Sequence, residues 1–402
     1  MKRIAPVVAA FSVGGGMAVA TFMEVPQAVF HLARPLVVIS LVSVVVGLAT
    51  GLAGSASNVV AVTVMAWLMR PQSSVAVFAA LLLAAVIAWR LGSGRLPDIQ
   101  TPVAIASGVF LVVGLVPMVP TLSAPIPDRV DAPELPTFLI LLDGYPRADS
   151  LANLGVDISA FIRQLEDRGF DHYPTATSHH SSTWQTLTLM LTGRSPAIED
   201  TFANRLAARQ SWTLPTGFVT VAPPIGSVTI PHIPVLNPGG PTVLEAAILQ
   251  SSVLGLWTAQ HVMDGYRFQL DRAIEVLAST EETHVFAHLL APHVPFLYDE
   301  VEPTPAPSCW PRCNLFLQEV SDWRAGMDGY LSWLNPKIVE TVDAILANHP
   351  AAEIVLFADH GGRYDDDVEE RHRVFLAART PTRPGLFSDA PHPGSLLSSL
   401  SG

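Results

Sequence analysis

Two short stretches of the sequence place an acid directly after an apolar run and follow it with glycine. In TFLILLDG the acid is Asp143, and in EIVLFADHGG the pair Asp359 and His360 takes the same place. A carboxylate oxygen and an imidazole nitrogen suit a divalent ion such as Zn²⁺ or Mn²⁺. An acid after a strand is most often a cap or turn residue, so either stretch alone is a weak signal. Their repetition favours a shared metal site.

A run of hydroxyl side chains precedes a third stretch, TWQTLTLMLTG, which predicts a helix over about residues 186–191 that ends near Gly193. These hydroxyls belong to Ser178, Ser181, Ser182 and Thr183. A hydroxyl at a helix start is ordinarily an N-cap. The helix N-terminus also favours negative charge, and metal coordination would lower the pKa of a hydroxyl and make it a nucleophile.

A fourth stretch, THVFAHLLAPHVPF, predicts a strand followed by a rigid loop that carries His293 between two prolines. A lone histidine in a loop is usually structural. Beside a metal and a nucleophile, it would donate to a substrate oxygen or a leaving group. His288 lies inside the predicted strand, where we expect it to pack or to support a metal ligand.

The chain has two cysteines, Cys309 and Cys313. In an oxidising compartment they would close a tight local disulfide. A zinc pair is the alternative, but this spacing normally needs a second ligand pair, and none follows in the sequence. The disulfide is therefore the favoured interpretation.

The four stretches with candidate chemistry lie in an acidic C-terminal part of the chain. Half of the 402 residues are hydrophobic, and the net charge is -12. Residues 1–125 carry six basic and two acidic side chains, a net of +4, which leaves -16 for the rest. That remainder, about 275 residues, is long enough for a proper core. Its acidity argues against nucleic acid as a partner, because phosphate binding needs basic patches.

Residues 1–121 have the composition of a transmembrane region. Apolar runs cover roughly residues 5–23, 35–54, 57–70, 74–90 and 101–121, and one span needs about 20 apolar residues. The first run also fits a cleaved signal peptide, because MKR, an apolar stretch and AVA match its three regions. Five spans that start inside, or four that start outside, leave the C-terminal domain outside the cytoplasm, and the lysine and arginine distribution agrees. Residues 122–136, rich in proline and acid, are typical of a linker.

Residues 137–402 have the pattern of an α/β domain with a mainly parallel sheet. Strands buried on both faces read as continuous apolar runs, and in such sheets the carboxyl ends of the strands carry the ligand chemistry. We therefore expect Asp143, Asp359 and His360 to meet at one edge of the sheet.

The four stretches, in this order, resemble the alkaline phosphatase superfamily. The match is closer to its sulfatase-like membrane branch, which includes lipoteichoic acid synthases and phosphoethanolamine transferases. The family pattern is a strand that ends in an acid, a Thr, Ser or Cys nucleophile that opens a helix, and a late DHG. The resemblance covers about residues 136–380. It implies a three-layer α/β/α domain outside the membrane, preceded by about five transmembrane helices, in a multi-pass protein of the cell membrane.

The resemblance implies a metal site and a substrate side. The implied ligands of one divalent ion are Asp143, Thr183, Asp359 and His360. Zn²⁺ or Mn²⁺ is the expected ion, with Mg²⁺ or Ca²⁺ as alternatives. His293 and Arg363 would bind the transferring group, and His293 would stabilise it or protonate the leaving group. The second metal of the superfamily's phosphatases is not expected, because no Asp-x-x-x-His motif follows the hydroxyl run.

Thr183 is the nucleophile that the resemblance implies, with Ser181 and Ser182 as alternatives. Sulfatases carry C-x-P-x-R before the LTG motif, and counting back ten residues from Gly193 places Thr183 at the position of that cysteine. The chain lacks both the cysteine and the P-x-R, which argues against a formylglycine sulfatase.

The implied function is transfer of a phosphoryl or substituted phosphoryl group, through the threonine, to a cell-envelope acceptor or to water. The bilayer would be a partner, and the substrate a lipid-linked or glycan phosphate. A phosphodiesterase or sulfuric ester hydrolase is the alternative, because transfer and hydrolysis share the covalent step. A non-catalytic, membrane-anchored binding protein is a further alternative, against which the complete set of site residues speaks. A transporter is disfavoured, because no charge lies well inside a predicted span.

Overall fold

The computed structural model describes residues 133–196, 211–221, 255–306, 323–362, 368–389 and 391–401, with residues 39, 43, 46, 208, 230 and 233–236. The chain divides into two compact units, and most described residues belong to the one made of residues 125–242, 261–306 and 315–402. Outside the described residues lie Cys309, Cys313, Arg363 and, except for residues 39, 43 and 46, the five predicted spans. No helix within the described ranges is long and apolar enough to cross a bilayer.

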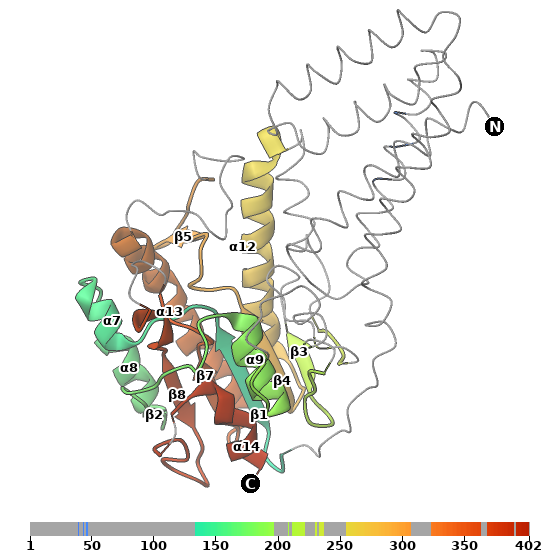
Figure 1. The fold of residues 1–402 in the computed structure, drawn as a ribbon, viewed down its shortest axis with the longest axis vertical. Coiled ribbons are helices and arrows are strands. Elements are labelled where there is room, and N and C mark those ends of the chain that lie inside the picture. The colour runs from blue at the N-terminus through green and yellow to red at the C-terminus, as the bar shows by residue number, and fades with distance from the viewer. Residues whose placement is uncertain are drawn as a thin grey trace, which may run out of the picture. The chain divides into compact units, whose positions relative to one another are not determined.

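A six-stranded sheet forms the centre of this unit, in the order β2–β8–β7–β1–β4–β3 (Figure 1). Its strands are β1 (Thr137–Leu142), β2 (Asp171–His172), β3 (Val219–Val221), β4 (His284–Leu289), β7 (Glu353–Phe357) and β8 (Leu376–Arg379). The adjacent strands β7, β1, β4 and β3 run parallel, as the sequence predicted. At one edge β8 and β2 pair in the antiparallel sense, which makes the sheet mixed.

Strand β1 lies between β4 and β7 and is buried on both faces. Its residues from Phe138 to Leu142 are completely inaccessible to solvent, which explains why the sequence there is continuously apolar rather than alternating. Leu141 pairs with His288 of β4 and with Phe357 of β7. The three strands therefore end at nearly the same level, and the residues that follow them meet there.

Helices and short 3-10 turns surround the sheet. The helices are α7 (Ala148–Asn153), α8 (Ser159–Glu166), α9 (Thr183–Thr192), α12 (Gly255–Ser279), α13 (Trp323–Asn348) and α14 (Leu396–Ser401), and the turns are η5 (Glu370–His372) and η6 (Pro393–Ser395). Helix α8 packs against α13, whereas α9 packs against η6 and α14. A small hairpin of β5 (Tyr298–Asp299) and β6 (Glu302–Pro303) contacts α13 through β5.

Helix α9 begins three residues before the predicted helix. Ser182 has an extended backbone (φ -144°, ψ 144°) and is the N-cap, and the N–H of Thr186 donates to the Ser182 carbonyl and closes the first turn. The Ser182 hydroxyl donates to Gln185 Oε1 and makes no capping bond to the first-turn amides. At the other end Gly193 adopts the left-handed conformation that commonly ends a helix.

Candidate active site

The side chains proposed as metal ligands lie at the carboxyl edge of the sheet. Asp143 follows β1 directly, and Asp359 and His360 follow β7 after one alanine. All three are buried, with exposures of 3%, 0% and 1%. The aligned ends of β1 and β7 thus bring together groups that are more than 200 residues apart, as the Gly144–Asp359 hydrogen bond shows with its separation of 215 residues.

Among the residues that the structure describes, three buried polar atoms of this cluster have no hydrogen-bond partner: Asp143 Oδ1, Asp359 Oδ2 and His360 Nε2. His360 Nε2 lies 3.5 Å from Asp143 Oδ1 and 3.7 Å from Asp359 Oδ2. Both distances are too long for a hydrogen bond of normal strength. Buried polar atoms without partners are rare in folded proteins, and a common reason for them is that they coordinate an ion.

The tautomer of His360 explains why these atoms do not pair with one another. His360 Nδ1 lies 2.8 Å from the carbonyl oxygen of Gly361. A carbonyl only accepts, so Nδ1 carries the proton, and the lone pair of Nε2 faces two carboxylate oxygens. Ligand atoms around a tetrahedral zinc ion, with bonds of about 2.1 Å, lie about 3.4 Å apart, close to both measured separations. These residues therefore fit a divalent metal ion.

His293, predicted to lie on the substrate side, lies next to this cluster. Ligand atoms of Asp143, His293 and His360 all lie within 4.8 Å of one another. The rings of His293 and His360 are nearly perpendicular, with centroids 5.7 Å apart. His293 Nδ1 donates to the carbonyl of Val294 at 2.7 Å, so in the neutral ring the lone pair is on Nε2. The half-buried His293 is therefore positioned to contribute either a metal ligand or a proton donor.

The charge state of Asp143 is set by opposing effects. Burial raises the pKa of its carboxyl group. The charge of His293, the hydrogen bond and charge of His288, and the charge of His360 lower this pKa by more than burial raises it. The net result is a pKa well below the usual value for aspartate. Asp143 is therefore ionised at neutral pH, as a metal ligand must be.

Gly144 connects the two strand ends. It has φ of +69°, and its N–H donates to Asp359 Oδ1 at 3.1 Å. A Cβ atom at this position would lie 3.2 Å from His360 Cε1 and 3.3 Å from His293 Cδ2. The glycine therefore gives the backbone both the conformation and the room to approach the side chains of His360 and His293.

The start of α9 is hydrogen-bonded to the same strand end. Thr186, which is 1% exposed, donates its hydroxyl to the carbonyl of Asp359 at 2.8 Å. Thr183, the proposed nucleophile, opens the helix three residues earlier and is half-buried. Of the alternatives, Ser182 uses its hydroxyl on Gln185, and Ser181 lies in the loop just before the N-cap.

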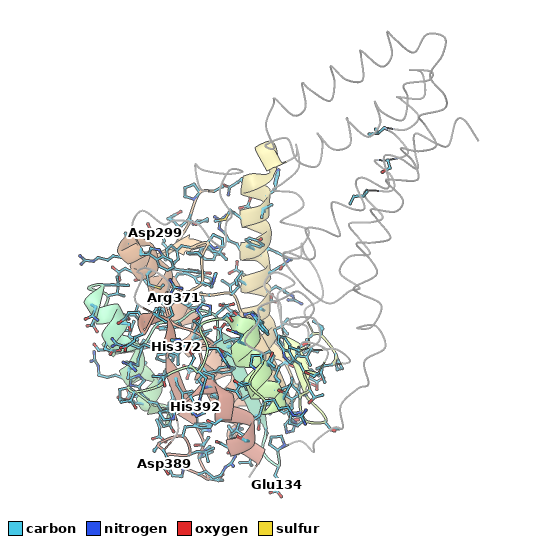
Figure 2. The ribbon with its side chains drawn as sticks, viewed as in Figure 1. Glu134, Asp299, Arg371, His372, Asp389 and His392 are labelled. Carbon is cyan, nitrogen blue, oxygen red and sulfur yellow. The ribbon has the colours of Figure 1, made fainter. Side chains whose placement is uncertain are left out.

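The turn η5 hydrogen-bonds both to the loop that follows β7 and to the loop before α9. The N–H of Gly361 donates to the carbonyl of Arg371, and His372 exchanges two hydrogen bonds of 2.8 Å with Ser178 (Figure 2 labels Arg371 and His372). A Cβ atom on Gly361 would collide with the carbonyl oxygens of two residues, Glu370 and Arg373, in and beside this turn. The turn η5 can thus pack this closely against the loop after β7 only because the residue after His360 is a glycine.

Two further residues of the site contact the proposed ligands, and the sequence indicated one of them, His288, but not the other, Thr186. His288, expected only to pack or to support a ligand, donates from Nε2 to Asp143 Oδ2 at 2.7 Å. The position of His288 in the predicted strand indicated this role. His288 is one residue before the end of β4, and β4 runs parallel to β1. Thr186 gave no signal, because its partner Asp359 lies 173 residues away.

No family model matches this chain, and no curated protein matches it. Among solved structures, it is similar to the integral membrane protein lipooligosaccharide phosphoethanolamine transferase A from Neisseria meningitidis, with 13% identity, 96% of this chain and 89% of that chain covered, and a TM-score of 0.40. The soluble domain of that transferase matches at 15% identity, 69% and 90% coverage, and a TM-score of 0.41.

The phosphonate monoester hydrolase of Agrobacterium radiobacter matches at 15% identity, with 66% of this chain and 72% of that chain covered and a TM-score of 0.39. A putative sulfatase from Bacteroides thetaiotaomicron matches at 12% identity, with coverages of 62% and 65% and a TM-score of 0.38. The solved structures to which this chain is similar thus include phosphoethanolamine transferases, a phosphonate monoester hydrolase and a putative sulfatase.

Proposed function

We propose that this chain is a metal-dependent enzyme of the sulfatase-like type, which moves a phosphoryl or substituted phosphoryl group through Thr183. The observation that supports this most is the convergence of three buried acceptor atoms without partners, on Asp143, Asp359 and His360. The hydrogen bond from Thr186 to Asp359 adds to it, because it ties the helix that Thr183 opens to the same strand end.

Asp143, Asp359 and His360 would hold one divalent ion, with the Thr183 hydroxyl as a further ligand. When bound, such an ion lowers the pKa of a coordinated hydroxyl and offsets charge on phosphoryl oxygens. Carboxylate oxygens combined with an imidazole nitrogen favour Zn²⁺ or Mn²⁺. Mg²⁺ and Ca²⁺ are weaker candidates, because both prefer sites made of oxygen alone.

Thr183 loses its hydroxyl proton to solvent, and its Oγ1 forms a bond to phosphorus in line as the bond from phosphorus to the leaving oxygen breaks. The product is a phosphothreonine or a substituted phosphothreonine. His293, protonated at Nε2, donates its proton to the leaving oxygen. The first-turn amides of α9, to which the N-cap residue Ser182 makes no side-chain bond, offset negative charge on the transferred group. An acceptor hydroxyl or water then attacks phosphorus and releases Thr183.

The apolar segments of residues 1–121 support a multi-pass membrane anchor, with the catalytic domain outside the cytoplasm. A lipid-linked donor, or a lipid or cell-envelope glycan acceptor, would then be within reach of the site. Fusions of reporters to the chain at residue 130 and at the C-terminus test the topology. If a reporter that works only in the cytoplasm is active at both positions, this topology is refuted.

The nucleophile is tested with the purified full chain, loaded with Zn²⁺ or Mn²⁺ and given a chromogenic phosphodiester. Thr183→Ala should lose turnover and Thr183→Ser should keep part of it. A matched control is Thr192→Ala, at the far end of α9, whose hydroxyl donates only within the helix end. Mass spectrometry of quenched wild type should find the phosphoryl group on the peptide that contains Thr183. Full turnover by Thr183→Ala would refute this nucleophile.

The same reaction distinguishes transfer from hydrolysis. Run in ¹⁸O-labelled water with and without an added alcohol, it reports which oxygen ends on phosphorus. Label in every product molecule assigns a phosphodiesterase, whereas a product ester of the alcohol assigns a transferase. A parallel assay with a chromogenic sulfate ester tests the sulfuric ester hydrolase alternative.

A further inference from the structure

Each of the two carboxylates at the proposed metal centre has one oxygen committed to a protein donor. Asp143 Oδ2 accepts from His288 Nε2 at 2.7 Å, and Asp359 Oδ1 accepts from the N–H of Gly144 at 3.1 Å. The other oxygen of each, Asp143 Oδ1 and Asp359 Oδ2, is buried and has no hydrogen-bond partner in the part of the chain that the structure describes. Each carboxylate therefore presents one oxygen to the centre and keeps the other turned to the protein.

His288 is held rigidly in this arrangement. The side chain is 1% exposed, and its residue pairs with Leu141 in the register between β4 and β1. One residue further on, the N–H of Asp143 donates to the carbonyl of Leu289 at 3.0 Å. Because a carboxylate oxygen only accepts, His288 Nε2 carries the proton of the bond. Turning the buried imidazole away would break this bond and leave Asp143 Oδ2 without its donor.

We propose that His288 is a positioning residue that fixes Asp143 as a ligand through one oxygen. Together with the amide of Gly144, it makes the site select a small ion of low coordination number, such as Zn²⁺, over Ca²⁺. Zinc is satisfied by about four ligands. Calcium takes 6–8 oxygens and often binds carboxylates through both oxygens, an arrangement that the hydrogen bonds to Asp143 Oδ2 and Asp359 Oδ1 disfavour. The inference rests on the metal centre of the proposed function.

A purely structural role makes a different prediction. If His288 only satisfied a buried carboxylate, its replacement would lower the stability of the fold and leave the relative affinities for two ions unchanged. If it orients the ligand, replacement weakens zinc binding, because groups that hold metal ligands in place typically contribute 10- to 100-fold in affinity. It also frees Asp143 Oδ2 for calcium. The ratio of the two affinities therefore separates the roles.

The test uses the purified full chain, stripped of metal and titrated with Zn²⁺ and with Ca²⁺ in competition with chromogenic chelators. For His288→Leu we expect zinc affinity to fall about 10- to 100-fold, with calcium affinity unchanged or higher. His288→Gln can still donate an N–H and should keep zinc affinity within about tenfold of wild type. The matched control is His284→Gln on the same strand, because His284 bonds to the carbonyl of Pro133, away from the centre.

Circular dichroism and thermal unfolding show which variants are folded. A folded His288→Leu protein with the wild-type ratio of zinc to calcium affinity overturns the inference about His288 but does not contradict the proposed metal centre. Wild-type chain that binds neither ion overturns both. Should His288→Leu fail to fold, His288→Asn gives the same comparison, because its shorter amide stays polar but does not reach Asp143. X-ray absorption of the zinc-loaded variants should also show a changed number of oxygen ligands.

Discussion

The hydroxyl of Thr186 joins the helix of the proposed nucleophile to the strand end that carries two proposed metal ligands. It donates to the carbonyl of Asp359 at 2.8 Å from a fully buried position. Thr186→Val keeps the shape and the β-branch but removes the donor. We expect this substitution to loosen the start of α9 relative to Asp359 and His360, and so to lower both stability and turnover.

The magnitude follows from burial and geometry. Replacing the donor leaves a buried carbonyl without this partner, which costs about 1 to 3 kcal/mol of unfolding free energy. The effect on the reaction arises separately. A displacement of the attacking oxygen by about 1 Å can cost about a hundredfold in rate, so we expect kcat to fall by about 10- to 100-fold, with a smaller change in KM.

Thr188→Val is the matched control on the same helix. Thr188 is also buried, donates to the carbonyl of Trp184 at 2.6 Å and accepts from Trp212 Nε1 at 3.0 Å. Its loss should cost a similar free energy of unfolding, but its partners lie outside the site, so kcat should stay near the wild-type value. Urea unfolding measures the first quantity, and steady-state turnover of a chromogenic phosphodiester measures the second.

Equal falls in kcat for the two valine variants would refute the reasoning, because they would show that any loss of helix stability reduces turnover. Thr186→Ser provides the complementary check. It restores the donor without the methyl group and should recover most of the lost rate. Unchanged kcat in Thr186→Val, at reduced stability, would show that the bond to Asp359 holds the fold and not the site.

Three further predictions concern separate parts of the domain. Gly144→Ala should cost about 1 to 2 kcal/mol for the left-handed backbone and weaken zinc binding, as chelator competition would show, because its Cβ meets His360 and His293. Arg383→Met, measured by urea unfolding, should cost about 3 kcal/mol, because it leaves the buried carboxylate of Glu353 without its cation. Burial lowers the pKa of His172 from 6.5, so the stability that the neutral ring contributes is present above pH 6.5 and is lost as pH falls through the lowered value. A plot of unfolding free energy against pH should therefore be flatter in this range for His172→Phe than for wild type. Parallel plots would contradict this.

The central strands could be predicted from the sequence because burial on both faces leaves a direct mark. TFLILL and EIVLF are continuously apolar, and they form β1 and β7 with every residue buried. The acids that follow them then had to lie at the carboxyl edge. The antiparallel edge was not predicted, because β2 has only two residues and its pairing with β8 is set by contacts across the sheet.

The finer contacts of the site depend on long-range geometry and left little trace in the sequence. The donation from His288 to Asp143 depends on the register of β4 against β1, which no local pattern specifies. The approach of His293 to His360 likewise depends on the path of the loop after β4. The types of the side chains indicated candidate site residues. Which of these residues lie in contact is determined by the pairing of the strands.

The order of the strands has a consequence for how the chain folds. The middle of the sheet pairs residues separated by 145 and 215 positions, as the bonds from His288 to Asp143 and from Gly144 to Asp359 show. Such contacts carry a large loop-closure entropy and form slowly. During synthesis, β1 must wait for β4 and then for β7 before it is covered on both sides. The proposed ligand set is therefore complete only after the last central strand docks, and an ion that binds it would stabilise the finished sheet by about 2.7 kcal/mol at a hundred times its dissociation constant. Metal supply would then influence how much of the newly made protein survives, in addition to its activity.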